Sequence, residues 1–161
     1  MAVITHEFFQ DNLRLLLSQE KSIKSPNPQV PDEVPSAAVT GFNITEKLQD
    51  IYTKDELFQL HLSQVEIYVK ELLPDPQPVL DHLSVPKARL VHIFNIVKYL
   101  IKHMDPLMPL PTSTAPLQLS HNYNYAKKVY VWNVIVRLRD WGQEVQLMKE
   151  EKLMCRNNTA L

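Results

Sequence analysis

Apolar residues recur every three or four positions in four separate stretches of the chain, and this spacing predicts four amphipathic α-helices. The helices are expected at roughly 5–24, 54–73, 85–104 and 122–152. Their apolar stripes are Phe9, Leu13, Leu16, Leu17 and Ile23; Phe58, Leu62, Val65, Val69, Leu72 and Leu73; Leu90, Ile93, Val97, Leu100 and Met104; and Val134, Leu138, Trp141, Val145 and Met148. Because each stripe needs a partner to cover it, we predict a single all-α domain over residues 1–161.

Polar residues mark where these helices should begin. Thr5 is expected to cap the first helix, and Thr53–Glu56 matches the capping box, in which Thr and Glu side chains each accept from a backbone N–H. Ser84 followed by Pro86 predicts the third start, because Pro is tolerated in the first turn of a helix. The segment 129–136 is rich in β-branched and aromatic residues that favour a strand. A lone strand would be unstable, so a helix is expected there too.

The connections between the helices are rich in proline and differ in length. Long ones cover residues 25–42 and 105–121, whereas the middle break covers only 74–78. An extended chain spans roughly 3.3 Å per residue against 1.5 Å in a helix, so each long connection can cross the whole bundle. The two helices that it joins would then run parallel. This arrangement predicts a long-chain four-helix bundle with up-up-down-down topology.

Composition narrows the classes of partner. The 161 residues are 45% hydrophobic with a net charge of −1, which suits one folded domain and provides no basic field for nucleic acid or an acidic membrane. No apolar run approaches the roughly 20 residues of a membrane span. The Met1 end lacks the basic start and apolar core of a secretory signal. We therefore expect the protein to act by docking to other proteins.

Residue types that carry catalysis or bind metals form no recognisable motif. Cys155 is the single cysteine, so no disulfide can form within the chain, and an incidental thiol is the expected role. The six histidines lack the i, i+4 spacing of a helical metal site, and most are expected at the surface or half-buried. Gly41 and Gly142 are too isolated to build a phosphate-binding loop. We predict no enzyme activity, no metal and no cofactor.

Two short segments match the acceptor pattern for N-glycosylation. They begin at Asn43 and Asn157. The pattern is short and often accidental, and it matters only if the chain passes through the secretory pathway.

The stretch from Tyr125 to Trp141 carries the strongest candidate for a binding surface. Tyr125 and Lys128 lie about one helical turn apart, and an aromatic ring beside a flexible cation forms a small contact patch. Taken alone, the pair also fits an ordinary helix start, with Tyr125 covering the bundle end and Lys128 solvated. Trp141 belongs to the core stripe and is interpreted as packing, whereas Trp132 lies off that stripe and fits either role.

Three features of the sequence together suggest a family. Y-A-K-K at 125–128 resembles the Phe-x-x-Lys motif that opens the last helix of cytokines using the leukaemia inhibitory factor receptor. Trp141 follows at a spacing found in such cytokines, and G-F-N-I-T-E-K-L at 41–48 resembles the end of the cardiotrophin first crossover. The chain thus resembles the interleukin-6-type helical cytokines, on the branch of ciliary neurotrophic factor, cardiotrophin and cardiotrophin-like cytokine. The helix and loop plan agrees across nearly the whole chain.

The resemblance implies an extracellular, monomeric ligand that clusters class I cytokine receptors and so activates kinase and STAT signalling. Tyr125 would stack on the leukaemia inhibitory factor receptor, and Lys128 would pair there with an acidic or carbonyl group. A second face, on the first and third helices, would engage glycoprotein-130. Its candidate residues, taken from helical phase, are Arg14, Ser18, Lys21, His92, Asn95, Tyr99 and Lys102. A non-signalling alpha receptor is a third expected partner, and secretion by a leaderless route fits this branch.

The chain departs from the family pattern at the contact itself. Tyr125 stands where the motif has Phe, and its hydroxyl needs a partner or exposure to water. Glu144 and Glu150 stand where ciliary neurotrophic factor has arginines, which puts that alpha-receptor contact in doubt. The alternative interpretation is an intracellular helical-bundle adaptor that presents a groove to partner helices. Binding to receptor ectodomains would separate the two.

Overall fold

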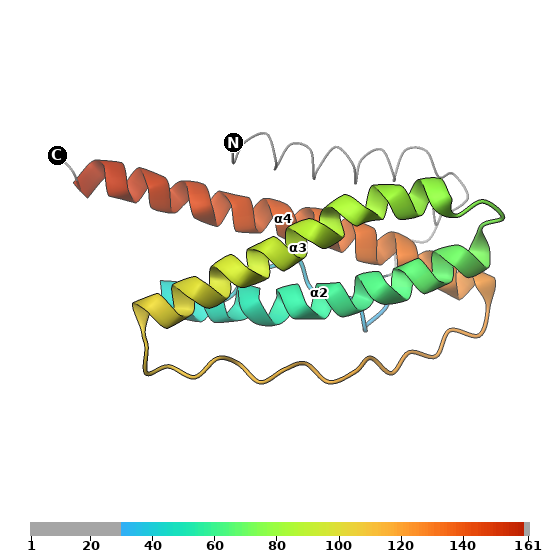
Figure 1. Ribbon diagram of the computed structural model, residues 1–161, viewed down its shortest axis with the longest axis horizontal. Helices are drawn as coiled ribbons and strands as arrows, with labels where there is room; N and C mark the ends of the chain where they lie inside the picture. Colours follow the sequence, from blue (N-terminus) through green and yellow to red (C-terminus); the bar gives the residue numbers. More distant parts are fainter. Residues whose placement is uncertain (1–29, 160–161) are drawn as a thin grey trace.

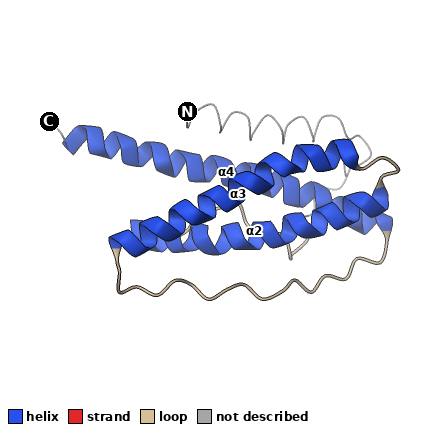
Figure 2. Cartoon of the chain, in the orientation of Figure 1, coloured by secondary structure: helices blue, strands red, loops and turns tan. Residues whose placement is uncertain are grey.

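The computed structural model describes residues 30–159, with side chains described through residue 149, and the regular elements of this range are all α-helices. They are α2 (Ile44–Leu72), α3 (Gln77–Met104) and α4 (Asn124–Thr159), shown in Figures 1 and 2. The all-α prediction is therefore confirmed over this range. The segment predicted as a helix at 5–24 lies outside the described residues. The same holds for three candidate receptor contacts, Arg14, Ser18 and Lys21.

Helix α2 begins at Ile44, so the start predicted at residue 54 is wrong. The side-chain oxygen of Asn43 accepts the backbone N–H of Glu46 at 2.9 Å, and the Glu46 carboxylate accepts that of Phe42 at 2.8 Å. The backbone N–H groups at the start of a helix have no carbonyl partner within the helix. These two bonds supply partners for two N–H groups there. The predicted capping box, Thr53–Glu56, consequently lies inside the helix, where each N–H already has an intrahelical partner.

A glycine allows the chain to enter this cap. Gly41 adopts a φ of 139°, a backbone conformation that residues with a Cβ rarely adopt. A Cβ at this position would also lie 2.7 Å from the backbone nitrogen of Lys47. Both observations explain why glycine suits the turn that delivers Asn43 to the start of α2.

The first connection, residues 30–43, is held along the early turns of α2. Asp50 accepts the backbone N–H of Thr40 at 3.0 Å. The ammonium of Lys54 donates to the carbonyl oxygen of Ala38 and lies 3.7 Å from Asp50. These contacts fix the part of the connection next to α2 against the helix.

Helix α3 begins at Gln77, so the start predicted at Ser84 is also wrong. Pro78 occupies the first turn, where its missing N–H costs no hydrogen bond. Pro86 lies buried inside the helix, where it does remove one bond. The helix continues through Pro86 because the turns on either side of it bury apolar side chains in the core, and such packing overrides local propensity.

Helix α4 confirms the helical prediction for residues 129–136 and extends beyond the predicted end at 152. Four side chains of this segment are completely buried: Tyr130, Val131, Val134 and Ile135. Their β-branched and aromatic character favours burial on any element, so packing against the rest of the bundle decides between helix and strand.

The predicted stripes of the three described helices form most of the core. The buried members are Phe58, Leu62, Val65, Val69, Leu90, Val97, Val134, Leu138 and Trp141. Six others are partly buried and pack against them: Leu72, Leu73, Ile93, Leu100, Val145 and Met148. Met104 is the exception at 48% exposed, because it is the last residue of α3, where the helix reaches the edge of the core. Trp132 is partly buried against this core.

The third connection determines how the helices run. After α3 has returned antiparallel to α2, residues 105–123 travel back along the length of the bundle, so that α4 starts at the same end as α3 (Figure 1). The Glu56 carboxylate of α2 binds this connection by accepting hydrogen bonds from the hydroxyls of Ser113 at 2.6 Å and Thr114 at 3.4 Å. Helices α3 and α4 are therefore parallel, as expected for a long third connection.

Helix α2 packs against both α3 and α4, whereas no Cα of α3 lies within 8 Å of one of α4 in the described chain. Tyr52 of α2 stacks on Phe94 of α3 at 4.5 Å between ring centres, and Phe58 meets Trp141 of α4 at 5.2 Å. The separation of α3 from α4 leaves an apolar groove of about 190 Å³ between them. Its walls and floor include Leu48, Ile51, Ile93, Val97, Val145 and Met148.

Candidate functional site

The first turns of α4 present the predicted aromatic and lysine pair. The Tyr125 side chain is 57% exposed, and Lys128 is half-buried about one helical turn further on. The neighbouring Lys127 side chain is directed toward α2 instead. Its ammonium pairs with Glu71 at 2.8 Å and lies 5.4 Å from the centre of the Tyr68 ring. Lys127 therefore ties α4 to α2, while Tyr125 and Lys128 share an outer face.

The predicted second face includes four residues of α3 within the described chain. All of them are exposed: His92, Asn95, Tyr99 and Lys102. The Tyr99 ring stacks on that of His103, with 5.2 Å between ring centres and 18° between planes. These four residues follow the 3.6-residue period and share one side of α3, while Tyr125 and Lys128 are on α4.

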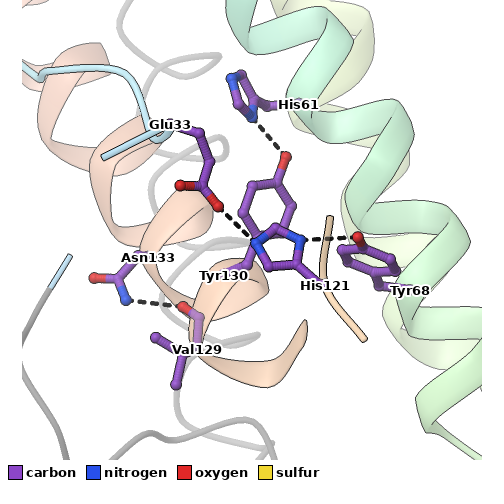
Figure 3. A network of polar contacts seen from close by, with 7 residues as sticks. All are labelled: Glu33, His61, Tyr68, His121, Val129, Tyr130 and Asn133. Atoms are coloured by element: carbon purple, nitrogen blue, oxygen red, sulfur yellow. Dashed lines mark hydrogen bonds and ion pairs between the residues drawn. The ribbon is translucent and has the colours of Figure 1, made fainter. Parts of the chain in front are cut away.

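A polar network that was not predicted lies near Tyr125, where Glu33 and His121 line the same hollow. His121, at the end of the third connection, reaches Glu33 of the first connection through Nε2 at 2.6 Å and the Tyr68 hydroxyl of α2 through Nδ1 at 2.8 Å. Figure 3 shows the imidazole held between these two partners, with Tyr130 of α4 beside it. One histidine thus links both long connections to the helical core.

The partners of His121 determine which nitrogen carries its proton. An ionised Glu33 carboxylate can only accept, so Nε2–H must be the donor in that bond. In the neutral ring Nδ1 is then an acceptor, and it receives the hydroxyl proton of Tyr68. For the neutral imidazole, the order Tyr68, His121, Glu33 is a directed chain of donors, and the two bonds hold the ring in one orientation.

The network continues into the core through Tyr130. Its hydroxyl lies 2.5 Å from Nδ1 of His61, and its ring stands edge-on to Tyr68, with 5.6 Å between centres. Burial raises the pKa of Tyr130 and lowers the pKa of His61 to about 4, so His61 is neutral at pH 7. His61 is only 1% exposed, unlike the surface or half-buried position expected for most histidines.

The sequence does contain a signal for His61. It follows Phe58 by three positions and directly precedes Leu62, so it belongs to the edge of the apolar stripe of α2. His121 has no comparable signal, because it lies outside the regular elements. Its partner Glu33 is 88 positions away, and only the folded connections bring the two together.

Another buried polar group lies earlier in α2, six residues before His61. Asp55 is completely buried, and one of its oxygens accepts from the Gln59 amide at 2.7 Å. Burial raises the pKa of Asp55 to about 8, although the bond from Gln59 works in the opposite direction. The carboxyl group is consequently neutral at pH 7. Asp55 is therefore a core residue and not part of a surface site, because its side chain has no contact with water.

A hollow of about 370 Å³ opens beside Tyr125. Residues 30–33 of the first connection form one side, and Tyr125, Ala126 and Val129 of α4 form the other, with His121 between them. Asp32 and Glu33 bring two carboxylates to this wall. The hollow therefore combines apolar surface, one aromatic ring and negative charge at the predicted contact site.

The described residues provide no cluster of three or more His, Cys, Asp or Glu side chains that could hold a metal ion. Within the same range, no helix is both long and apolar enough to span a membrane. The arrangement around Tyr125 is suited to recognition of another surface, since it offers an exposed ring, a cation and a lined hollow.

Comparisons with family models, with curated proteins and with solved structures each return no match. The resemblance to interleukin-6-type cytokines therefore stays a prediction from the sequence.

Proposed function

We propose that residues 5–24 form a helix in the groove between α3 and α4 and complete an up-up-down-down bundle. The apolar walls of the groove need a cover, and the stripe from Phe9 to Ile23 supplies one. A helix of about 20 residues spans about 30 Å, which covers most of α3, whose 28 residues span about 42 Å. Helix α2 already occupies the opposite side of α3 and α4, so the added helix would be the fourth corner.

The position of Val30 supports the direction of this helix. Val30 lies at the hollow beside Tyr125, at the end of the bundle where α4 starts. A helix that leads into Val30 would therefore run antiparallel to α4 and parallel to α2. Amide hydrogen exchange on the full chain tests this: we expect strong protection over 9–23, and exchange there at the rate of an unfolded peptide would overturn the proposal.

The protein is, in this proposal, an extracellular cytokine that binds and clusters class I receptors and so activates kinase and STAT signalling. The observation that carries it is the exposed Tyr125 beside Lys128 at the start of a helix that follows a long crossover. Tyr125 and Lys128 dock on the leukaemia inhibitory factor receptor. The exposed side of α3 that includes Tyr99 docks on glycoprotein-130.

The exposed position of Tyr125 also bears on the difference from the family motif. An exposed phenol keeps its hydroxyl in water before docking, so this group requires no buried partner in the free protein. On docking, the hydroxyl can donate to a polar group of the receptor, which a Phe ring cannot do. Tyr125 is thus compatible with the proposed contact.

Binding of the full chain to the ectodomain of the leukaemia inhibitory factor receptor tests this function. We expect Tyr125→Ala or Lys128→Ala to weaken binding by about tenfold, or about 1.4 kcal/mol. Tyr123→Ala and Lys70→Ala are matched controls, because both residues are exposed and neither belongs to the proposed contact. Unchanged binding in both test variants, or no binding by the folded chain, would refute the receptor assignment.

The groove between α3 and α4 also favours one alternative, an intracellular adaptor that takes up a helix of a partner. The two functions make opposite claims about residues 5–24. In the cytokine these residues fill the groove, whereas in the adaptor they leave it open to the partner. The hydrogen-exchange measurement therefore separates the alternatives as well.

A further inference from the structure

We propose that the hollow beside Tyr125 receives a cationic side chain, arginine or lysine, from the protein that docks at Tyr125 and Lys128. This inference rests on the proposed docking function and adds the chemistry of the partner surface. The hollow, its charge and its position relative to the two docking residues each support it.

The shape of the hollow suits a long side chain with an apolar stem. Its volume of about 370 Å³ lies within the range of about 300–1,000 Å³ that is typical of ligand pockets. Val30, Pro31 and Val129 provide apolar contacts for methylene groups, which arginine and lysine bury readily. The Tyr125 ring can cover the charged end, since cations are attracted to the face of an aromatic ring.

The charge of the hollow selects a cation. The Asp32 side chain is exposed and forms no hydrogen bond or ion pair with another described residue. One oxygen of Glu33 is engaged by His121 at 2.6 Å, which orients the carboxylate at the wall of the hollow. A cationic side chain would therefore find one carboxylate already positioned and a second one without a competing partner in the described chain.

Helical geometry places Lys128 outside the hollow. Relative to Tyr125, residues 126 and 129 point roughly 100° and 40° to one side around α4, and residue 128 points roughly 60° to the other. Tyr125 thus separates an acidic hollow from a basic side chain. A matching partner surface therefore carries a basic residue that enters the hollow and an acidic group that pairs with Lys128. The width of the Tyr125 ring separates these two groups.

Two small probes test the hollow without any receptor. N-acetyl-arginine amide and its neutral isostere N-acetyl-citrulline amide are titrated into the full chain, and amide shifts are followed by NMR. We expect saturable shifts at residues 30, 32, 33, 121 and 125–129 with the arginine probe alone, since Pro31 has no amide hydrogen. Asp32→Asn should weaken that binding by up to about fivefold, the effect of a surface ion pair. Asp75→Asn, which removes an exposed charge from the α2–α3 connection, should leave it unchanged.

The receptor measurement is run in parallel with the same variants. No shifts with the arginine probe, equal shifts with citrulline, or equal effects of Asp32→Asn and Asp75→Asn would each overturn the hollow as a cation site. Receptor binding that weakens in Tyr125→Ala but not in Asp32→Asn would leave the docking function intact and refute the hollow's part in it. Binding of the arginine probe without receptor binding would support the hollow and refute the receptor assignment.

Discussion

Two large aromatic side chains of α4, Trp141 and Tyr130, are both completely buried, yet their surroundings differ. Trp141 packs on Phe58 of α2, and its indole nitrogen has no hydrogen-bond partner among the described residues. The Tyr130 hydroxyl meets His61, and its ring contacts those of Tyr68 and His121. The first region is held by apolar contact, whereas the second adds directional polar contacts.

The difference teaches where each kind of interaction is used. Apolar burial is non-directional, so the Trp141 region stabilises the bundle and imposes little on the surrounding connections. The polar contacts near Tyr130 have strict geometry and include Glu33 and His121 from the two long connections. This second region therefore positions the loops around Tyr125, where the proposed docking site lies.

Removal of the Trp141 side chain should have the largest effect. Trp141→Ala leaves a large cavity at a completely buried position, and we expect the free energy of unfolding to fall by about 3–5 kcal/mol. Trp132→Ala is the matched control and should cost clearly less, because Trp132 is only partly buried. Urea unfolding monitored by circular dichroism measures both. Equal losses would show that the Trp141 region is not the centre of the apolar packing.

Measuring the free energy of unfolding as a function of pH should test the polar region around Tyr130 and His61. Unfolded His61 takes up a proton below its usual pKa of 6.5, whereas buried His61 does so only near pH 4. The unfolded state therefore binds more protons between these values, and the contribution of His61 to stability rises with pH across this window. Relative to His61→Leu, the wild type should gain up to about 3 kcal/mol from pH 4 to pH 7.

The comparison with His61→Leu is needed because Asp55 acts in the opposite direction. Its folded pKa of about 8 lies above the usual value of 3.8, so folded Asp55 keeps a proton that the unfolded chain loses in this range. Its contribution to stability therefore falls as pH rises from about 4 to about 8. This effect is common to both proteins and cancels in their difference. A difference that stays flat from pH 4 to pH 7 would contradict the assignment for His61.

The same contrast explains how much the sequence could predict. Phe58 and Trp141 follow the 3.6-residue period of their helices, so their burial could be predicted without knowing their neighbours. The starts of α2 and α3 could not be predicted, because the sequence offers two candidates for each. Asn43 and Thr53 both precede a Glu at the spacing of a capping box, and Pro78 and Pro86 both suit a first turn. Which candidate is used depends on packing beyond the local pattern.

The site was accessible to sequence reasoning only in its exposed part. The spacing of Tyr125 and Lys128 predicts a contact patch, and its docking role stays a prediction. The exposure of His92, Asn95, Tyr99 and Lys102 agrees with their helical phase. The hollow and the bond from His121 to Glu33 were not predictable, since both depend on how two irregular connections cross the same end of the bundle.

The parallel course of α3 and α4 has an electrostatic consequence for that end of the molecule. Both helices begin there, so the partial positive charges of two helix macrodipoles gather at one end, where α2 contributes the only negative pole among the described helices (Figure 1). Carboxylates next to a helix start are stabilised by about 0.3–1 kcal/mol each. Asp32 and Glu33, which line the hollow at the first turns of α4, thus lie where the backbone itself favours negative charge.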